Sequence, residues 1–207
     1  VDTEQSTYLV DCGLSQSEGG QFPDFRGLDI DQIDAVLLTH AHIDHCGGLP
    51  VLENRGYLED DAPIIATHPT TQIAQTLLDD SLKIHKREAR QSTGRQRFTK
   101  ADVEAVYERF TPISYGTHFI QELTEEADDD PLTVRYGQAG HLLGSAWVSL
   151  QTGGQTAVFS GDLGGRAAHL PDIESPPEGE QLFIESTYGD RHTHQSITDA
   201  EGDLWNH

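Results

Sequence analysis

The chain of 207 residues is poor in several residue types, and each shortage excludes a class of protein. Its two cysteines, Cys12 and Cys46, are too few for the disulfide scaffold of a small secreted domain. No apolar run approaches the roughly 20 residues that a membrane-spanning helix needs, and no charged-then-apolar signal peptide opens the chain. The composition therefore predicts a cytoplasmic protein with no membrane partner.

Positive charge is scarce as well. The chain has 13 Lys and Arg residues against 35 Asp and Glu, for a formal charge of −22, and only 3 of the cations are lysine. Such a surface repels polyanions and destabilises the folded state by self-repulsion. At about 1 M salt the Debye length falls to about 3 Å, so distant like charges hardly interact. The scarcity of lysine favours a halophilic protein in a salt-rich cytoplasm over the alternative, an acidic protein with a cationic partner.

Against this background, four potential metal ligands are crowded into six residues. His40, His42, Asp44 and His45 follow the apolar run 35–38 directly. Imidazole nitrogens and carboxylate oxygens together suit zinc, and side chains at the junction of a strand and a helix converge on one point. The spacing therefore predicts a metal site, and a histidine-rich surface turn is the less favoured alternative.

Three other polar residues follow or adjoin strand-like runs, each beside a glycine. They are Asp11 before Cys12 and Gly13, His141 after Gly140, and Asp162 after Gly161. Glycines permit the tight turns and close approaches that let several strands deliver ligands to one edge of a sheet sandwich. Taken singly, such residues are more often turn-forming or structural. Together with the histidine cluster they predict a shared site.

These segments resemble the metallo-β-lactamase superfamily. Within it they are most similar to the β-CASP branch of RNA- and DNA-processing nucleases, in particular the prokaryotic relatives of the cleavage-and-polyadenylation specificity factor endonuclease. The discriminating segment is 184–191, IESTYGDR, which resembles the motif that opens the β-CASP region. Its alternative interpretation is a solvated turn after the strand-like run 182–184.

The resemblance implies an α/β fold of the metallo-β-lactamase type. This is an αβ/βα sandwich of two mixed sheets flanked by helices, expected here to be incomplete at both ends. Residues 1–184 would form the amino-terminal part of the core, and residues 185–207 the start of a truncated β-CASP region. Because the family continues well past this point, the chain is expected to be an amino-terminal fragment, inactive alone, of a protein that could form a homodimer.

The resemblance also implies roles for individual residues. His40, His42 and His141 would hold a first zinc ion, and Asp44, His45 and a bridging Asp162 most of the site for a second. Asp11 would orient these ligands or their loop.

The implied activity is that of a zinc-dependent ribonuclease of the mRNA 3′-end processing or decay type. Two metals would activate a hydroxide, with Asp44, Asp162 and Glu185 as catalytic residues. Glu185 would position a histidine, absent from this chain, that protonates the leaving oxygen. The alternative on the same fold is a metal-dependent hydrolase of a small ester, thioester or lactam.

One segment opposes the acidic character of the chain. Seven of the 13 cations fall within residues 83–100 against Glu88 alone, which gives a local charge of +6 and leaves −28 on the rest. A basic run is usually a solvated helix face. In a chain this poor in cations, the clustering favours contact with an RNA backbone. The proposed contact residues are Lys83, Lys86, Arg87, Arg90, Arg95, Arg97 and Lys100.

Hydrophobic periodicity predicts short strands with helices between them. A long helix is expected from about Thr70 to Arg90. A second helix is expected to begin after Thr99 with a capping box and to include Phe110 among its apolar residues. A short helix is expected at 44–54, an acidic loop at 122–130 and a proline-rich connection at 171–179. Strands are predicted at 8–10, 35–38, 63–66, 132–136, 147–150, 157–159 and 182–184.

Overall fold

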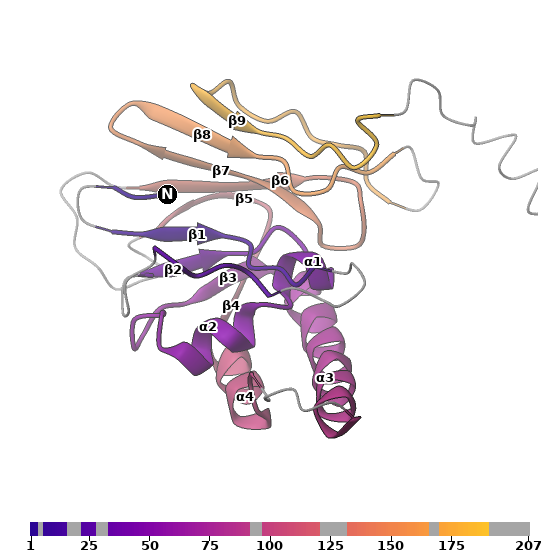
Figure 1. Cartoon of the computed structure of the whole chain (residues 1–207). Coiled ribbons are helices and arrows are strands. Elements are labelled where there is room, and N and C mark those ends of the chain that lie inside the picture. Colours follow the sequence, from indigo (N-terminus) through magenta and orange to yellow (C-terminus); the bar gives the residue numbers. More distant parts are fainter. Residues whose placement is uncertain are drawn as a thin grey trace, which may run out of the picture.

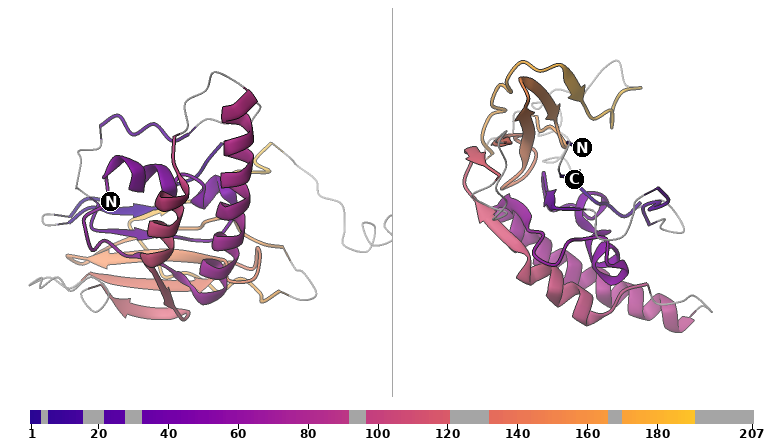
Figure 2. Two further views of the ribbon diagram at one scale, coloured as in Figure 1. Left: turned by 90° about the horizontal axis from the view of Figure 1, so that it is seen from below. Right: turned by 90° about the vertical axis from the view of Figure 1, so that its left-hand side faces the viewer.

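The computed structural model describes residues 1–3, 6–15, 22–27, 33–91, 97–120, 132–165 and 170–190. Two β-sheets pack against each other, and the helices cover the outer face of one of them (Figure 1). This arrangement confirms the predicted α/β sandwich of two sheets, but the first sheet is parallel where two mixed sheets were expected. Within the described ranges the helices lie on a single side of the molecule, as the two views of Figure 2 also show. The predicted acidic loop at 122–130 lies outside the described residues.

The first sheet has the order β1-β2-β3-β4 and consists of parallel strands. These are β1 (Tyr8–Val10), β2 (Ala35–Leu37), β3 (Ile64–Thr67) and β4 (Phe110–Ile113). Every residue of β2 and β3 is buried, as expected for parallel strands covered on both faces. Since parallel strands share one direction, their carboxyl ends meet at one edge of the sheet.

Helices connect the strands of this sheet. Between β2 and β3 lie α1 (Ile43–Cys46) and α2 (Leu49–Arg55), and between β3 and β4 lie α3 (His68–Gln91) and α4 (Lys100–Glu108). The single helix predicted at 44–54 is in fact two, because Gly47 and Gly48 separate them. The predicted capping box of α4 is present, with Thr99 and Asp102 bonding to each other's backbone.

The second sheet is mixed. Its strands pair antiparallel in the order β5-β6-β7-β8-β9, except that β8 and β9 are parallel. The strands are β5 (Gly116–Phe119), β6 (Thr133–Gln138), β7 (Ala146–Thr152), β8 (Gln155–Phe159) and β9 (Gln181–Phe183).

Two strands, β4 and β5, escaped prediction. Phe110 was expected on the apolar side of the second helix, but that helix ends at Glu108 and residue 110 begins β4. Pairing with β3 decides the conformation here, since Phe110 lies opposite Ile64 in the parallel register. A half-buried edge strand that contains Pro112 carries little strand signal of its own.

The first sheet separates two apolar layers because its side chains alternate. Ala35 and Leu37 face the second sheet and pack with residues such as Tyr136 and Val148. The intervening Val36 and Leu38 face the helices and join a cluster that includes Leu78 and Val106. The first sheet is therefore packed on both of its faces, and this packing supports the loops at its carboxyl edge.

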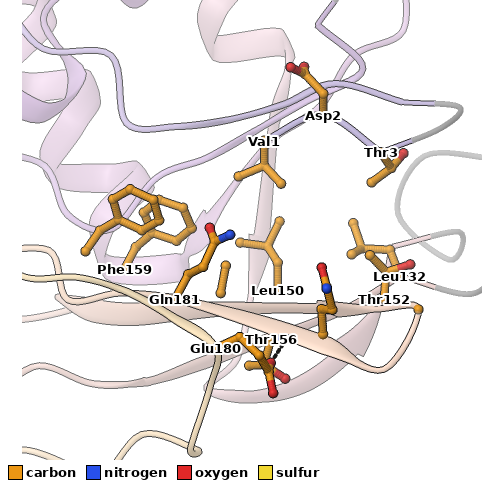
Figure 3. A pocket seen from close by; sticks show the side chains of 14 residues that line it. Val1, Asp2, Thr3, Leu132, Leu150, Thr152, Thr156, Phe159, Glu180 and Gln181 are labelled. Atoms are coloured by element: carbon orange, nitrogen blue, oxygen red, sulfur yellow. Dashed lines mark hydrogen bonds between the residues drawn. The ribbon is translucent and has the colours of Figure 1, made fainter.

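A groove of about 1010 Å³ opens between the sheets at the end remote from those carboxyl edges (Figure 3). It is lined by residues 1–3 and by parts of β7, β8 and β9, including Leu150, Phe159 and Phe183. Phe183 stacks on Phe159 with ring centroids 4.5 Å apart and still remains 53% exposed.

The described helices include none that is long and apolar enough to cross a membrane.

Candidate metal centre

The predicted ligands meet at the carboxyl edge of the sandwich, the edge at which α1 lies (Figure 1). Asp11 follows β1, His40 follows β2, and Asp162 follows β8, while His141 lies in the loop between β6 and β7. The two sheets are joined here, because the Ala146 amide at the start of β7 donates to the Thr39 carbonyl at 2.9 Å. We call this group of side chains the metal edge; it comprises Asp11, His40, His42, His45, His141 and Asp162.

Four of these side chains point donor atoms at a common centre. One ligand atom from each of His40, His42, His141 and Asp162 lies within 4.8 Å of all the others. Nδ1 of His42 is 3.1 Å from Nε2 of His40 and 3.1 Å from Nε2 of His141. Oδ2 of Asp162 is 3.6 Å from Nε2 of His141 and 3.9 Å from Nε2 of His40.

These separations suit a tetrahedral cation. Ligands about 2.0–2.1 Å from a tetrahedral zinc ion lie roughly 3.3 Å from one another, close to the separations observed. Hydrogen bonding alone explains the cluster poorly, because Nδ1 of His42 carries either one proton or one lone pair and faces two nitrogens. A divalent metal therefore fits the donor set.

Hydrogen bonds orient the buried His40. The Thr39 hydroxyl donates to Asp11 Oδ2 at 2.7 Å, so its oxygen accepts a proton from Nδ1 of His40, 3.0 Å away. This assignment leaves a lone pair on Nε2, the atom that faces the centre. Burial, aided by the neighbouring imidazoles of His45, His42 and His141, lowers the pKa of His40 to about 2, so the ring stays neutral.

Asp162 faces a second group of donors with its other oxygen. Its Oδ1 lies 3.3 Å from Nε2 of His45, whereas Oδ2 faces His40 and His141. A carboxylate so placed can contribute to two adjacent cation sites. Asp44 is exposed and does not belong to the cluster of four, although its charge acts on His42 and His45.

Asp11 holds this arrangement together. Its carboxylate accepts hydrogen bonds from the Thr39 amide at 2.8 Å, from the Thr39 hydroxyl and from Nδ1 of His45 at 2.7 Å. The last bond leaves Nε2 of His45 to face Asp162. Burial lowers the pKa of His45, but Asp11, Asp162 and Asp44 outweigh it, and the net shift is upward. A metal cation bound between His45 and Asp162 would take the place of the proton that Nε2 of a protonated His45 carries.

The backbone of Asp11 is itself strained. Its φ of 59° makes it the one non-glycine residue of the described chain in the left-handed region. Aspartate tolerates this conformation better than most residues, and the three hydrogen bonds of its side chain compensate for the cost. The strain is accordingly concentrated at the residue that fixes His45 and Thr39.

Glycines bring the loops of the metal edge into backbone contact. A Cβ at Gly13 would lie 1.5 Å from the Asp44 carbonyl oxygen, and one at Gly164 would lie 1.7 Å from the Gly140 oxygen. Gly164 also donates its amide hydrogen to the Ala139 carbonyl at 2.8 Å, which ties the Asp162 loop to the His141 loop. Neither contact leaves room for a side chain.

Hydroxyl side chains that sequence reasoning missed also support the site. Ser145 Oγ accepts the amide hydrogens of His141 at 3.0 Å and Leu142 at 3.2 Å. The hydroxyls of Thr67, the last residue of β3, and of Thr70, in the first turn of α3, donate to the Gly144 carbonyl. Serine and threonine beside loop glycines were the available signal, but Gly144, the partner of Thr67 and Thr70, lies 77 and 74 residues away from them in the sequence.

Glu185 has described contacts of its own. Oε1 accepts the amide hydrogen of Leu163 at 2.8 Å, and Oε2 accepts that of Thr187 at 3.2 Å. Partial burial raises its pKa, but these hydrogen bonds outweigh it and the net shift is downward. Glu185 therefore braces the residue next to Asp162, a contact that the predicted partnership with a distant histidine did not anticipate.

The two cysteines are buried outside the cluster. Burial raises the pKa of both thiols, that of Cys46 to about 12, and Cys46 donates to the Ala41 carbonyl at 3.2 Å. A buried protonated thiol behaves as a small apolar side chain. Cys12 and Cys46 accordingly belong to the helix-covered apolar layer.

The basic segment lies apart from the metal edge. Lys83, Lys86 and Arg87 are on the distal half of α3, and Arg97 and Lys100 lie at the approach to α4. Arg95 and the side chain of Arg90 lie outside the described residues. The predicted RNA-contact residues are consequently not neighbours of the predicted metal ligands.

Comparison with known proteins agrees with this geometry. The chain is 40% identical over 186 residues to Ribonuclease TTHA0252 of Thermus thermophilus, covering 88% of this chain and 38% of that protein. It is 35% identical over 196 residues to Transcription termination factor FttA of Methanocaldococcus jannaschii, covering 91% and 29%.

An RNase J-like protein of the same archaeon is 29% identical over 191 residues, covering 91% of this chain and 39% of that protein. The chain thus spans less than two fifths of the length of these relatives. A sequence profile of the metallo-beta-lactamase superfamily matches residues 1–196. With its sandwich fold and its edge of histidines and aspartate, the chain belongs to the metallo-β-lactamase superfamily.

Proposed function

We propose that the chain carries the metal centre of a zinc-dependent ribonuclease of the β-CASP branch. The observation that carries the proposal is the convergence of His40, His42, His141 and Asp162, with the second oxygen of Asp162 turned toward His45. Relatives named as a ribonuclease and an RNase J-like protein support RNA as the substrate. Residues 185–207 are proposed to begin the β-CASP region.

In this proposal His40, His42 and His141 hold one ion, and Asp44, His45 and Asp162 contribute to a second, with Asp162 shared. When bound, two such cations make hydroxide available at neutral pH and neutralise charge on phosphoryl oxygens. Asp11 keeps His45 in the tautomer whose Nε2 is free, and Glu185 braces the loop of Asp162. The donor of a proton to the leaving oxygen is proposed to lie outside this chain.

The test is single-turnover cleavage of labelled RNA with the zinc content determined on the same samples. The full-length protein should cleave RNA only with metal bound, the chain of 207 residues should bind zinc with little cleavage, and Asp162→Ala should eliminate turnover. Metal-dependent hydrolysis of a small ester, thioester or lactam without cleavage of RNA would contradict the proposal and favour the alternative substrate class.

We also propose that the acidic surface is an adaptation to high salt. With a formal charge of −22, self-repulsion should be relieved by screening, so the melting temperature should rise steeply between low salt and molar potassium chloride. A flat response would favour a cationic partner instead. The cytoplasmic location and the homodimer stay predictions.

A further inference from the structure

The distal half of α3 carries cations on one face. Lys83, Lys86 and Arg87 stand at positions i, i+3 and i+4, which share one side of a helix, and position 90 continues the register. The packed side of α3 carries Ala74, Leu78 and Leu82, which are buried in the helix-covered layer. At about 100° per residue, the middle of the basic face lies about 130° from the middle of the packed side. We call the residues Lys83, Lys86, Arg87 and Arg90 the cationic stripe.

The structure separates cations that are already paired from those that are not. Lys83 lies 3.9 Å from Asp80, and Lys100 pairs with Glu104, so each has an acid on its own helix. Lys86 and Arg87 form no ion pair within the described ranges. Within the predicted RNA-contact surface, Lys86 and Arg87 are therefore the two helical cations whose charge is not neutralised by an ion pair in the described ranges.

Arg97 lies near this half of α3. Its guanidinium carbon is 4.7 Å from the centre of the Phe22 ring, and its amide donates to Nε2 of His85 at 2.9 Å. Stacking on a ring occupies one face of a guanidinium and leaves its N–H groups at the rim able to bind phosphate. Arg97 is exposed and can extend the surface beyond the helix.

Stabilisation of the helix end does not account for the stripe. The helix dipole acts within the last turn, and α3 ends at Gln91. Lys83, Lys86 and Arg87 all precede that turn, and position 90 alone of the stripe lies within it. In a chain of formal charge −22, the placing of 7 of the 13 cations within residues 83–100 favours binding of a polyanion.

The stripe lies at a fixed distance from the metal edge. The start of α3 is anchored there, because Thr67 and Thr70 bond to Gly144 in the His141 loop. From His68 to Arg87 the helix rises about 28 Å at about 1.5 Å per residue. A stacked single strand covers that distance in about eight nucleotides at about 3.4 Å each.

We propose that the cationic stripe is a backbone-binding exosite for the same RNA strand whose scissile phosphate lies at the metal edge. This inference rests on the proposed function, and it adds a length requirement. An RNA shorter than about eight nucleotides reaches one site only, whereas a longer strand engages both and gains affinity.

A repeating polyanion suits this face better than an acidic protein does. Successive turns of the helix carry cations three or four residues apart, about 4.5–6 Å along the axis, without an aromatic anchor among them. Protein interfaces of normal size have an apolar or aromatic core. On this half of α3 the large exposed apolar side chain among the described residues is Ile84, 41% exposed, and it lies to one side of the stripe.

The test measures binding of labelled single-stranded RNAs of 4, 8, 12 and 16 nucleotides to the full-length protein as a function of salt. Lys86→Glu with Arg87→Glu should weaken binding of the 12- and 16-mers at least tenfold and leave the 4-mer nearly unchanged. The slope of log affinity against log salt should fall by about 1.4 for two lost phosphate contacts. Thermal melting and zinc content verify folding.

A matched control reverses two exposed cations elsewhere, Arg26→Glu with Arg55→Glu, and changes the net charge equally. The inference is overturned if this control weakens the long RNAs as much, or if the stripe variant affects all lengths alike. It is also overturned if the stripe variant binds every RNA as the wild-type protein does, which is the result expected if the stripe instead binds an acidic protein. Cleavage of bis(p-nitrophenyl) phosphate reports on the metal edge alone: if the wild-type protein cleaves neither it nor RNA, the proposed function fails instead.

Discussion

The metal edge and the cationic stripe are built in opposite ways. Residues of the metal edge come from positions as far apart as Asp11 and Asp162 and are cross-braced by hydrogen bonds between loops. The stripe comes from eight consecutive helical positions and depends on little beyond the helix itself. A single substitution should therefore disable the first, whereas the second should lose function in proportion to the charge removed.

The largest effect is expected for His141→Ala. It removes one of four convergent donors, and tight zinc binding at the histidine-rich site should be lost by more than the roughly 100-fold that removal of a supporting residue costs. This site should also fill before the one containing His45, whose described donors are fewer. Isothermal titration with zinc against a competing chelator measures both.

The matched control is His118→Ala, a partly exposed histidine of β5 whose Nε2 contacts the Ser114 carbonyl at 2.8 Å. It should leave zinc affinity unchanged. Equal loss from His118→Ala and His141→Ala would contradict the assignment of His141 as a ligand. His169, another candidate control, lies outside the described residues.

A smaller effect is expected for Glu185. Glu185→Ala removes the acceptor of both the Leu163 and the Thr187 amide hydrogens, so the Asp162 loop should loosen and zinc affinity should fall roughly 10-fold. Glu185→Gln retains one carbonyl oxygen and should have a weaker effect on zinc while still slowing RNA cleavage. If Glu185→Gln lost zinc as readily as Asp162→Ala, the proposed role of the segment 184–191 would be wrong.

The sequence predicted where ligands lie better than what supports them. Four of the six residues 40–45 are predicted ligands, so their proximity follows from the sequence itself. Strand ends beside glycines marked Asp11, His141 and Asp162, which do meet at one edge. The supporting contacts of Thr39 with Asp11 and of Thr67 with Gly144 depend on which strands and loops become neighbours. That information arises only from strand pairing and from packing of the two sheets.

The same distinction explains the errors in secondary structure. α3 and β1 have strong local patterns; β1 was predicted to the residue and α3 to within two residues at each end. β4 is defined by pairing with β3, and there tertiary contacts overrode local preference. The break between α1 and α2 falls at Gly47 and Gly48, a local signal that the predicted single helix passed over.

The smallest expected effect concerns His85, which lies beside the stripe and links it to the rest of the fold. Its ring stacks on Phe98 with centroids 4.6 Å apart, and its Nε2 accepts the Arg97 amide hydrogen. Burial, with some help from Arg97, lowers the pKa of His85. Protonation would replace the acceptor with a donor and place a cation beside Arg97.

Because the folded state disfavours protonated His85, its contribution to stability is complete above the unfolded pKa of about 6.5 and is lost as pH falls through the lower folded value. His85→Phe keeps the stacking surface but cannot titrate. The free energy of unfolding, measured in urea from pH 8 to pH 5, should fall more steeply for the wild-type protein than for this variant. The difference should be about 0.5–1.5 kcal/mol, the net value of one hydrogen bond. Parallel curves would mean that His85 does not respond to pH in this range, and that the base of the stripe is held by ring packing alone.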